Sequence, residues 1–570
     1  MSPSLYRPFT QPGEIRLLTI LPGPANSPLI CHLTTQALSS TPDYELVSYI
    51  RHSTNKTLEI VIDNLPFPAQ ENAVAALHRL RLRSVPRHVW VDAICINRDD
   101  HEERERHILL MGRILAQARH VCVCLGESAE PKGKDKGWAG AREVVDSAWW
   151  EQVWSLPEVI LGKKIVLITP EDEITWDTVE RAVKERHNDV PNTHSTFHGF
   201  NRLREKWASG HWDVSIYQLL ELSRHLDCED PRDRIYALFG LEPSLTQFEI
   251  APKYDVPAAD IHLDFTRKMI QRTGRLDILN CVRPRCGTTP TESEPSPSWV
   301  PTWSSTLNEP VPFLNWSETS PNYAAGNLMK AQLRKTNGPK TLILSGVRFD
   351  QIAELGNPWH PTSAAPPTSR HGITPLDQWE QIALTTHLSC PYNGPSGRKD
   401  ALWRTYIADS PADNDVPKHH ETFIECWYDR VGWSSQSSGD MEKAWAKHMT
   451  DLLHKSQQTK NPLRKIKNTL DFSRHGREEY EAYCRRIYNA CAHRRLLVSK
   501  RGYIGLAPWS TEVGDVIVVL HGGRTPFLLR PGSEPGVYEF VGECFVYGIM
   551  GGEGLTWEHA IAAARDFRIV

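Results

Sequence analysis

The stretch that most constrains this chain is residues 89–96, VWVDAICI. It is a short, nearly continuous apolar run with one carboxylate, Asp92, inside it. Such a run is typical of a strand that is covered on both faces, as in a parallel sheet. Because an unpaired buried carboxylate is costly, we expect Asp92 to be hydrogen-bonded or to lie where the strand emerges from the sheet.

The segments around this run alternate between strand-like and helix-like patterns. Further strands are predicted at 44–49, 58–68, 120–126 and 163–169, and a hairpin at 14–20 and 29–33. Apolar residues recur at helical spacing in 71–83, 99–118 and 141–154. Strands that alternate with helices pair in parallel through right-handed crossovers. We therefore predict an α/β domain over residues 1–170.

The rest of the chain divides into three further regions. Residues 171–340 carry mainly helical patterns. Residues 341–490 begin with a β element and continue, over 356–485, as loop-rich sequence with weakly periodic helical segments. Residues 491–570 alternate in the strand period around Gly and Pro turns, which predicts a small antiparallel β module, of which a barrel is one form.

The composition bounds the class of protein. The 570 residues are 40% hydrophobic and 24% charged, which is typical of a globular chain. A net charge of -4 gives no reason to expect nucleic acid as a partner. The 12 cysteines lie mostly in apolar runs, which fits reduced thiols in a cytosolic protein. No apolar run reaches the ~18 residues of a membrane span, and no secretory signal pattern is present, so we expect a cytoplasmic protein without a membrane span.

Several motifs together resemble fungal heterokaryon-incompatibility (HET) domain proteins. In the first third they are YELVSY (44–49), VWVDAICIN (89–97), the segment 103–118 and SAWWEQVWSLPEV (147–159). Farther along they are DPRDRIYALFGL (230–241), SWVPTWS (298–304) and the tail pieces GYIGLAP and VGECFVYGIMGGE. The resemblance covers most of the chain except 356–485. It implies a role in non-self recognition and regulated cell death, with protein partners reached by self-association or by an incompatibility partner.

The resemblance also implies a fold and a site. HET domains are thought to resemble TIR domains, which have a flavodoxin-like parallel sheet and some of which cleave NAD with one glutamate. Trp154 and Glu158 have the Trp-to-Glu spacing of the TIR catalytic segment. This implies Glu158 as a catalytic carboxylate, Asp92 and Ser48 as residues that orient it or bind polar ligand atoms, and Trp154 as a ring that stacks on the ligand. NAD is then a candidate substrate, and no cofactor is evident.

Each of these residues also has a structural alternative. Ser155 and Glu158 are spaced as in a capping box, with Ser155 as the N-cap and Glu158 at the third helical position. Asp92 is alternatively a carboxylate that bonds loop amides past its strand, and Ser48 a hydrogen-bonded serine at the end of a strand. The sequence leaves these alternatives open.

The chain departs from the family beside the candidate site. Arg51 and His52 stand where a tryptophan and a glycine are usual, and Pro157 stands where a glutamine is usual. Three functions are therefore compatible with the sequence: an NAD hydrolase, an interaction protein that acts by assembly, and a degenerate paralogue without activity. A metal enzyme is not among them, because His101 and His107 are six residues apart and do not share a helical face.

Overall fold

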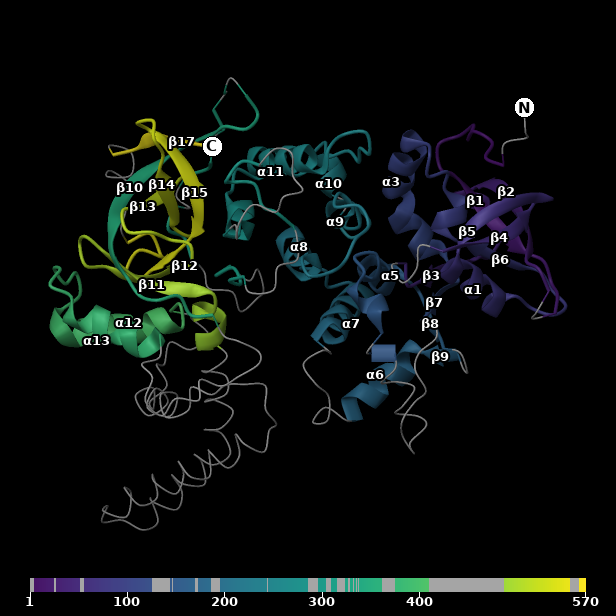
Figure 1. The fold of residues 1–570 in the computed structure, drawn as a ribbon, viewed down its shortest axis with the longest axis horizontal. Helices are drawn as coiled ribbons and strands as arrows, with labels where there is room; N and C mark the ends of the chain where they lie inside the picture. The colour runs from purple at the N-terminus through teal and green to yellow at the C-terminus, as the bar shows by residue number, and fades with distance from the viewer. Residues whose placement is uncertain are drawn as a thin grey trace, which may run out of the picture. The chain divides into compact units, whose positions relative to one another are not determined.

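The structure is a computed structural model in which the placed segments form two compact units. The first comprises residues 1–262 together with Trp303, and the second comprises the remaining residues from 263 onward. Both units are shown in Figure 1. The structure describes all residues except 1–4, 25–26, 52–55, 126–143, 146, 170–172, 186–194, 243, 285–295, 304–308, 315–322, 327–328, 332, 335, 337, 361–374, 410–485 and 554–562. His52 and most of the segment 356–485 lie outside the described residues.

The first unit is built on a nine-stranded sheet with the order β5-β4-β2-β1-β6-β3-β7-β8-β9. Its strands are β1 (Glu14–Ile20), β2 (Ile30–Ala37), β3 (Glu45–Tyr49), β4 (Thr57–Ile62), β5 (Leu65–Gln70), β6 (Arg87–Trp90), β7 (His120–Cys124), β8 (Ile165–Ile168) and β9 (Glu173–Thr175). The predicted hairpin at its start is confirmed, since β1 and β2 pair antiparallel along their whole length.

The centre of this sheet is parallel. β3 pairs in parallel with β6 on one side and with β7 on the other, and β7 continues in parallel to β8. The flanking pairs β1–β2, β1–β6, β4–β5 and β8–β9 are antiparallel, so the sheet is mixed. The predicted α/β class is thus confirmed as a mixed sheet with parallel pairs. Helices lie between the parallel strands along the chain.

The prediction of one strand over residues 89–96 is wrong in its second half. β6 ends at Trp90, and Asp92–Cys95 form a short helix, α2. The turn closes because the Cys95 amide donates to the Val91 carbonyl at 2.7 Å, while the Val91 amide lies 3.4 Å from the Cys95 sulfur. The expectation that Asp92 lies where the strand emerges is confirmed, because Asp92 is the first residue of α2, directly after the end of β6 and Val91.

Two other predicted elements differ from the structure. Residues 58–68, predicted as one strand with an exit turn, form the hairpin β4–β5, whose tight turn has positive φ at Asp63 (50°) and Asn64 (63°). Edge strand β5 carries Pro66 and Pro68, which cannot donate to a further strand and so protect the edge. Of the helix predicted at 141–154, residues 144–145 are helical in the described part, and Ala148–Glu151 form a 3₁₀ turn, in which the Ser147 hydroxyl accepts from the Trp149 amide at 3.2 Å.

The helices of the first unit confirm the predicted helical character of its later residues. They are α1 (Glu71–Leu80), α3 (His101–Gln117), α5 (Ser155–Leu161), α6 (Trp176–Glu185), α7 (Ser195–Ala208), α8 (Ile216–Ser223), α9 (Asp233–Tyr236) and α10 (Ser244–Gln247), followed by α11 (Ala258–Thr273) at the junction of the units. Helix α3 begins as its acidic first turn predicts, with the Asp100 carboxylate accepting from the Glu103 amide at 3.1 Å.

Two glycines bring α3 against the segment that follows α9. A side-chain carbon added at Gly112 would lie 2.7 Å from the Cα of Gly240, and one added at Gly240 would lie 2.8 Å from the Cα of Gly112. Both distances are too short for any side chain, so this backbone contact requires glycine on both sides. The contact holds the residues around α9 against α3, and these residues carry part of the site described below.

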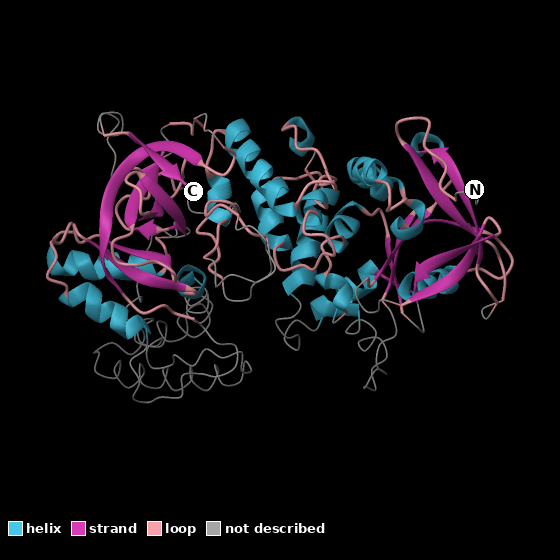
Figure 2. Cartoon of the chain, turned by 45° about the horizontal axis from the view of Figure 1, so that its top comes forward, coloured by secondary structure: helices cyan, strands magenta, loops and turns pink. Residues whose placement is uncertain are grey.

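The second unit contains an eight-stranded, mostly antiparallel sheet with the order β13-β14-β15-β17-β10-β11-β12-β16. Its strands are β10 (Leu342–Leu355), β11 (Arg494–Ser499), β12 (Ile504–Pro508), β13 (Val516–Leu520), β14 (Phe527–Pro531), β15 (Val537–Glu543), β16 (Phe545–Val546) and β17 (Arg565–Ile569). β10 also pairs with β13, and the sheet curls strongly in Figure 2. This confirms the predicted antiparallel β character of the tail.

Helices and a buried ion pair complete this unit. α12 (Pro375–Thr385) and α13 (Gly394–Tyr406) pack Trp379, Trp403 and Tyr406 into a core shared with β11 and β12. Glu543 of β15 and Arg494 of β11 form a buried pair at 3.2 Å. The predicted domain boundaries at 170, 340 and 490 remain predictions.

The glycine contact generates a stability prediction. Gly112→Ala should destabilise the first unit by about 1–3 kcal/mol, because the added methyl group meets backbone rather than a side chain that can move. Gly199→Ala in α7 is the matched control, since a side-chain carbon there would meet only the end of Leu222 at 3.4 Å. Thermal unfolding of both variants measures the difference. Equal melting temperatures would contradict the proposed role of the contact.

Candidate functional site

A pocket of about 330 Å³ lies in the first unit, where β3 and β6 end and α2 begins. Ligands of open α/β sheets bind at the carboxyl ends of parallel strands, and β3 and β6 are a parallel pair. The residues that line the pocket come from the β3 and β6 ends, from α3 and α5, and from the region of α9: they are Arg51, Asp92, Ile96, Arg98, Arg104, His107, Ile108, Met111, Trp154, Glu229, Asp230, Asp233 and Tyr254.

Asp92 lies on the wall of this pocket between two arginines. Its Oδ2 atom is 2.9 Å from Arg98 and 3.2 Å from Arg51. Burial by itself would raise the pKa of Asp92, but the two guanidinium groups outweigh it and hold the pKa below its usual value. The carboxylate is therefore ionised and engaged by side chains. A hydrogen bond from the Ala93 backbone acts in the same direction, so the alternative in which Asp92 bonds amides past its strand is present as a smaller contribution.

Glu158 lies on α5 and is buried, with 4% of its surface exposed. The Ser48 hydroxyl, at the end of β3, donates to its Oε2 atom at 2.5 Å, and the Trp149 indole donates to the same hydroxyl oxygen at 2.8 Å. Burial raises the pKa of Glu158 to about 7, against the opposing effects of Arg51 and of the Ser48 hydrogen bond. Glu158 is thus poised to change protonation near neutral pH.

The alternative in which Ser155 and Glu158 form a capping box is wrong. Ser155 already lies inside α5, whose N-cap is Trp154, and the Ser155 hydroxyl donates to the Gln152 carbonyl at 2.6 Å. The Glu158 side chain turns to Ser48 instead of the start of its helix. The same spacing does form a capping box at Ser215 and Gln218 in α8.

The loop after β3 is held by Gln152, a residue that the sequence did not single out. Its Oε1 atom accepts from the Arg51 amide at 3.0 Å, and its Nε2 group donates to the Tyr49 carbonyl at 3.3 Å. These bonds fix the backbone from which the Arg51 side chain reaches Asp92. Gln152 is therefore a positioning residue for the charged wall of the pocket.

An aromatic wall faces these charges. Asp233 accepts from the Trp154 indole at 3.0 Å through one oxygen and from the Tyr254 hydroxyl at 2.5 Å through the other. Burial is the main reason that the pKa of Asp233 is raised. The Tyr254 backbone is held by Glu105 of α3, which accepts from its amide at 2.8 Å. Asp233 thereby fixes both aromatic rings of the pocket.

The structure separates the four predicted site residues into two layers. Asp92 and Trp154 line the pocket, whereas Ser48 and Glu158 are bonded to one another and are not among its lining residues. The two layers interact electrostatically, because Glu158 lies within the influence of the charges of both Arg51 and Asp92. Sequence reasoning missed Asp233. The available signal is the DPRDRIYALFGL motif, which contains this residue and contributes to the family resemblance.

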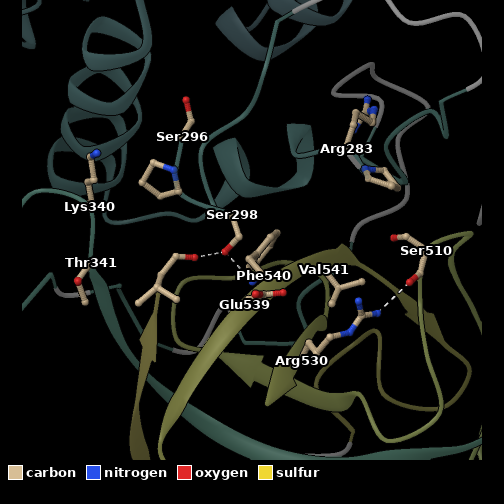
Figure 3. A pocket seen from close by; sticks show the side chains of 13 residues that line it. Arg283, Ser296, Ser298, Lys340, Thr341, Ser510, Arg530, Glu539, Phe540 and Val541 are labelled. Atoms are coloured by element: carbon tan, nitrogen blue, oxygen red, sulfur yellow. Dashed lines mark hydrogen bonds between the residues drawn. The ribbon is translucent and has the colours of Figure 1, made fainter. Parts of the chain in front are cut away.

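A second pocket, of about 550 Å³, lies in the second unit beside β15 (Figure 3). Two of its polar side chains are already engaged in hydrogen bonds with neighbouring segments. The Ser298 hydroxyl accepts from the Phe540 amide at 2.8 Å, and the Arg530 guanidinium binds Asp515 at 2.9 Å and the Ser510 carbonyl at 2.8 Å. We therefore place the candidate site in the first unit.

Among the described residues, no group of three or more His, Cys, Asp or Glu side chains is arranged to hold a metal ion. None of the helices in the described part of the chain combines the length and apolarity needed to cross a bilayer.

Comparisons with known proteins identify the family. Residues 44–139 match the heterokaryon incompatibility protein (HET) family, and this segment contains Ser48, Arg51 and Asp92. The chain is a HET-domain protein. Residues 344–570 match the Het-6 β-barrel domain, which begins within β10 and includes every later strand of the second unit. The HET match ends before Glu158 and Asp233, so part of the site described above lies beyond it.

The HET-domain protein is also similar to a characterised relative along nearly its whole length. Heterokaryon incompatibility protein 6, OR allele, of Neurospora crassa is 22% identical to it, over 95% of this chain and 94% of the relative. No solved structure matches the chain.

The raised pKa of Glu158 predicts a pH dependence of stability. The first unit is called the HET unit below, because it contains the HET match. In the folded HET unit, Glu158 keeps its proton up to about pH 7, whereas the unfolded chain loses it near pH 4.5. The stability from this group is therefore fully present below pH 4.5 and is lost as the pH rises to 7. The loss corresponds to about 3 kcal/mol. The melting temperature of the natural protein should therefore fall from pH 5 to pH 8 relative to that of Glu158→Gln. If the melting temperatures of the two proteins change with pH in parallel, Glu158 ionises with its usual pKa and the prediction is wrong.

Proposed function

We propose that this HET-domain protein acts in heterokaryon incompatibility, as an effector of non-self recognition that leads to regulated cell death. The name of the Neurospora relative and its similarity along both chains support this role. We further propose that the protein works in the cytoplasm and through protein partners, either by self-association or by contact with an incompatibility partner.

We propose that the HET unit has a TIR-like, flavodoxin-like fold. The order of its parallel strands supports this. Across the sheet, the parallel strands lie in the order β6-β3-β7-β8. When these four strands are numbered by their order along the chain, this spatial order is 2-1-3-4. This is the order with which flavodoxin-like sheets begin. In such sheets the ligand crevice lies at the carboxyl ends of the strands, where the pocket is found here.

The activity that we propose is hydrolysis of NAD. The bond between ribose C1′ and the pyridinium nitrogen breaks, its electron pair leaves with neutral nicotinamide, and C1′ becomes oxocarbenium-like. A carboxylate stabilises this cation, and water then bonds to C1′ and gives up a proton. Glu158 takes the role of the carboxylate, Ser48 orients it, Asp92 binds polar ligand atoms and Trp154 stacks on a ring.

The observation that carries this proposal is the position of Glu158. It is a buried carboxyl with a pKa of about 7, fixed by Ser48 at the end of β3 and electrostatically coupled to two residues of the pocket wall. Perturbed carboxyl groups beside a pocket are characteristic of catalytic sites. The role requires that ligand binding opens the layer that separates Glu158 from the pocket.

A second function, an interaction protein without catalysis, is favoured by Arg51. Its guanidinium lies 3.2 Å from Asp92 and lowers the pKa of Glu158 from the still higher value that burial alone would give. A resident cation thus neutralises the candidate site in the absence of ligand. In this alternative, the HET unit signals death by assembly, and Asp92 and Arg51 have a structural role.

Nicotinamide release from NAD tests the enzyme proposal. Purified full-length protein should release nicotinamide, and Glu158→Gln should lower the rate by about 100-fold or more, which is the usual contribution of a group that stabilises transition-state charge. The rate should rise between pH 6 and pH 8 as Glu158 ionises. Glu173→Gln is a matched control, because Glu173 is exposed on β9 and does not line the pocket.

Absence of release, under conditions in which an active TIR enzyme works, would contradict the enzyme proposal for this chain. Overexpression in fungal cells then separates the remaining alternatives. Death that persists in Glu158→Gln indicates an interaction protein, whereas a folded protein that causes no death indicates a degenerate paralogue.

A further inference from the structure

Two arginines stand at the pocket beside carboxylates that they do not bind closely. Arg98 lies 3.6 Å from Glu229, and Arg104 lies 3.6 Å from Asp230. Both distances exceed hydrogen-bond length. Each pair joins the segment around α3 to the segment before α9, and all four residues line the pocket.

The carboxylates of the pocket, in contrast, have close partners elsewhere. Asp92 binds Arg98 at 2.9 Å, and Asp230 binds Arg232 at 2.8 Å. Both oxygens of Asp233 accept hydrogen bonds from the aromatic wall. Glu229 is the exception, and 59% of its side chain is exposed to solvent. The acceptors are thus largely committed, while Arg98 and Arg104 retain donor capacity toward the pocket.

The position of Arg104 is fixed without the use of its hydrogen-bond donors. Its guanidinium carbon lies 3.6 Å from the centroid of the Tyr254 ring, and Tyr254 is itself held by Asp233. A cation that rests on an aromatic ring keeps its N–H groups at the edge of the guanidinium plane, where they can bind a ligand. Arg104 is therefore organised before any ligand arrives.

We infer that Arg98 and Arg104 bind a diphosphate group of the ligand, which takes the place of Glu229 and Asp230 beside them. Guanidinium groups match phosphate oxygens through paired, charge-assisted hydrogen bonds, which are stronger than ion pairs at 3.6 Å. When the diphosphate displaces the two carboxylates, neither is left buried without a partner. Glu229 is exposed to solvent, and Asp230 keeps its ion pair with Arg232. This inference rests on the proposed function in that NAD carries such a diphosphate.

Isothermal titration calorimetry of the full-length protein with inorganic pyrophosphate tests the inference. Pyrophosphate should bind, with a Kd that rises with ionic strength. Glu229→Gln should lower the Kd by about threefold to tenfold, because it removes the competing carboxylate. Arg104→Gln should raise the Kd by about tenfold or more, because it removes a charge-assisted contact. Glu173→Gln should bind as the natural protein does.

A second variant guards against misfolding. If Arg104→Gln lowers the melting temperature markedly, Arg98→Gln gives the same comparison, since Arg98 is more exposed than Arg104. The inference is overturned if pyrophosphate does not bind, or if Glu229→Gln and the arginine variants all match Glu173→Gln. ADP-ribose distinguishes the source of the diphosphate: tighter binding than pyrophosphate indicates a nucleotide, and equal binding indicates the inorganic ion.

The outcome is separable from that of the proposed function. Pyrophosphate binding without nicotinamide release would retain the diphosphate site and reject the hydrolase. Nicotinamide release with a KM that is unchanged in Glu229→Gln and in Arg104→Gln would retain the hydrolase and reject the diphosphate site.

Discussion

The site of this protein depends on the close approach of two backbones, at Gly112 of α3 and Gly240 after α9. Without side chains between them, the helix and the later segment come near enough for Tyr254 to bind Glu105 and for Asp233 to face Trp154. The pocket is therefore not a property of the parallel sheet alone. It forms between the end of the sheet and a segment that lies beyond the HET match.

The charges around the pocket follow one rule. Buried carboxylates are tolerated where cations or hydrogen-bond donors compensate the loss of water. Asp92 has two arginines, and Asp233 has an indole and a phenol. Glu158 has the Ser48 hydroxyl and the charge of Arg51. Burial prevails at both Asp233 and Glu158, so the pKa of Asp233 is raised and that of Glu158 rises to about 7. The difference in compensation gives neighbouring carboxylates different protonation behaviour within one site.

The sequence predicted much of the first sheet, because alternating apolar strands and amphipathic helices are local patterns. The prediction failed where contacts between residues distant in sequence determine the position of a side chain. Residues 155–158 have the spacing of a capping box, yet Glu158 turns to Ser48, which is distant in sequence. Residues 215–218 have the same spacing and do form one. Asp233 was missed for the same reason, since its partners Trp154 and Tyr254 belong to other elements and no local pattern reveals their approach.

The pairing of β10 has a consequence for the order of folding during synthesis. Its first residues pair with β17, its middle with β13 and its last residues with β11. The sheet of the second unit therefore cannot close until residue 569 has been translated, and contacts of such long sequence separation form slowly. The strands of the first sheet all lie before residue 176. A nascent chain can thus hold a folded HET sheet while its barrel partner is still unmade.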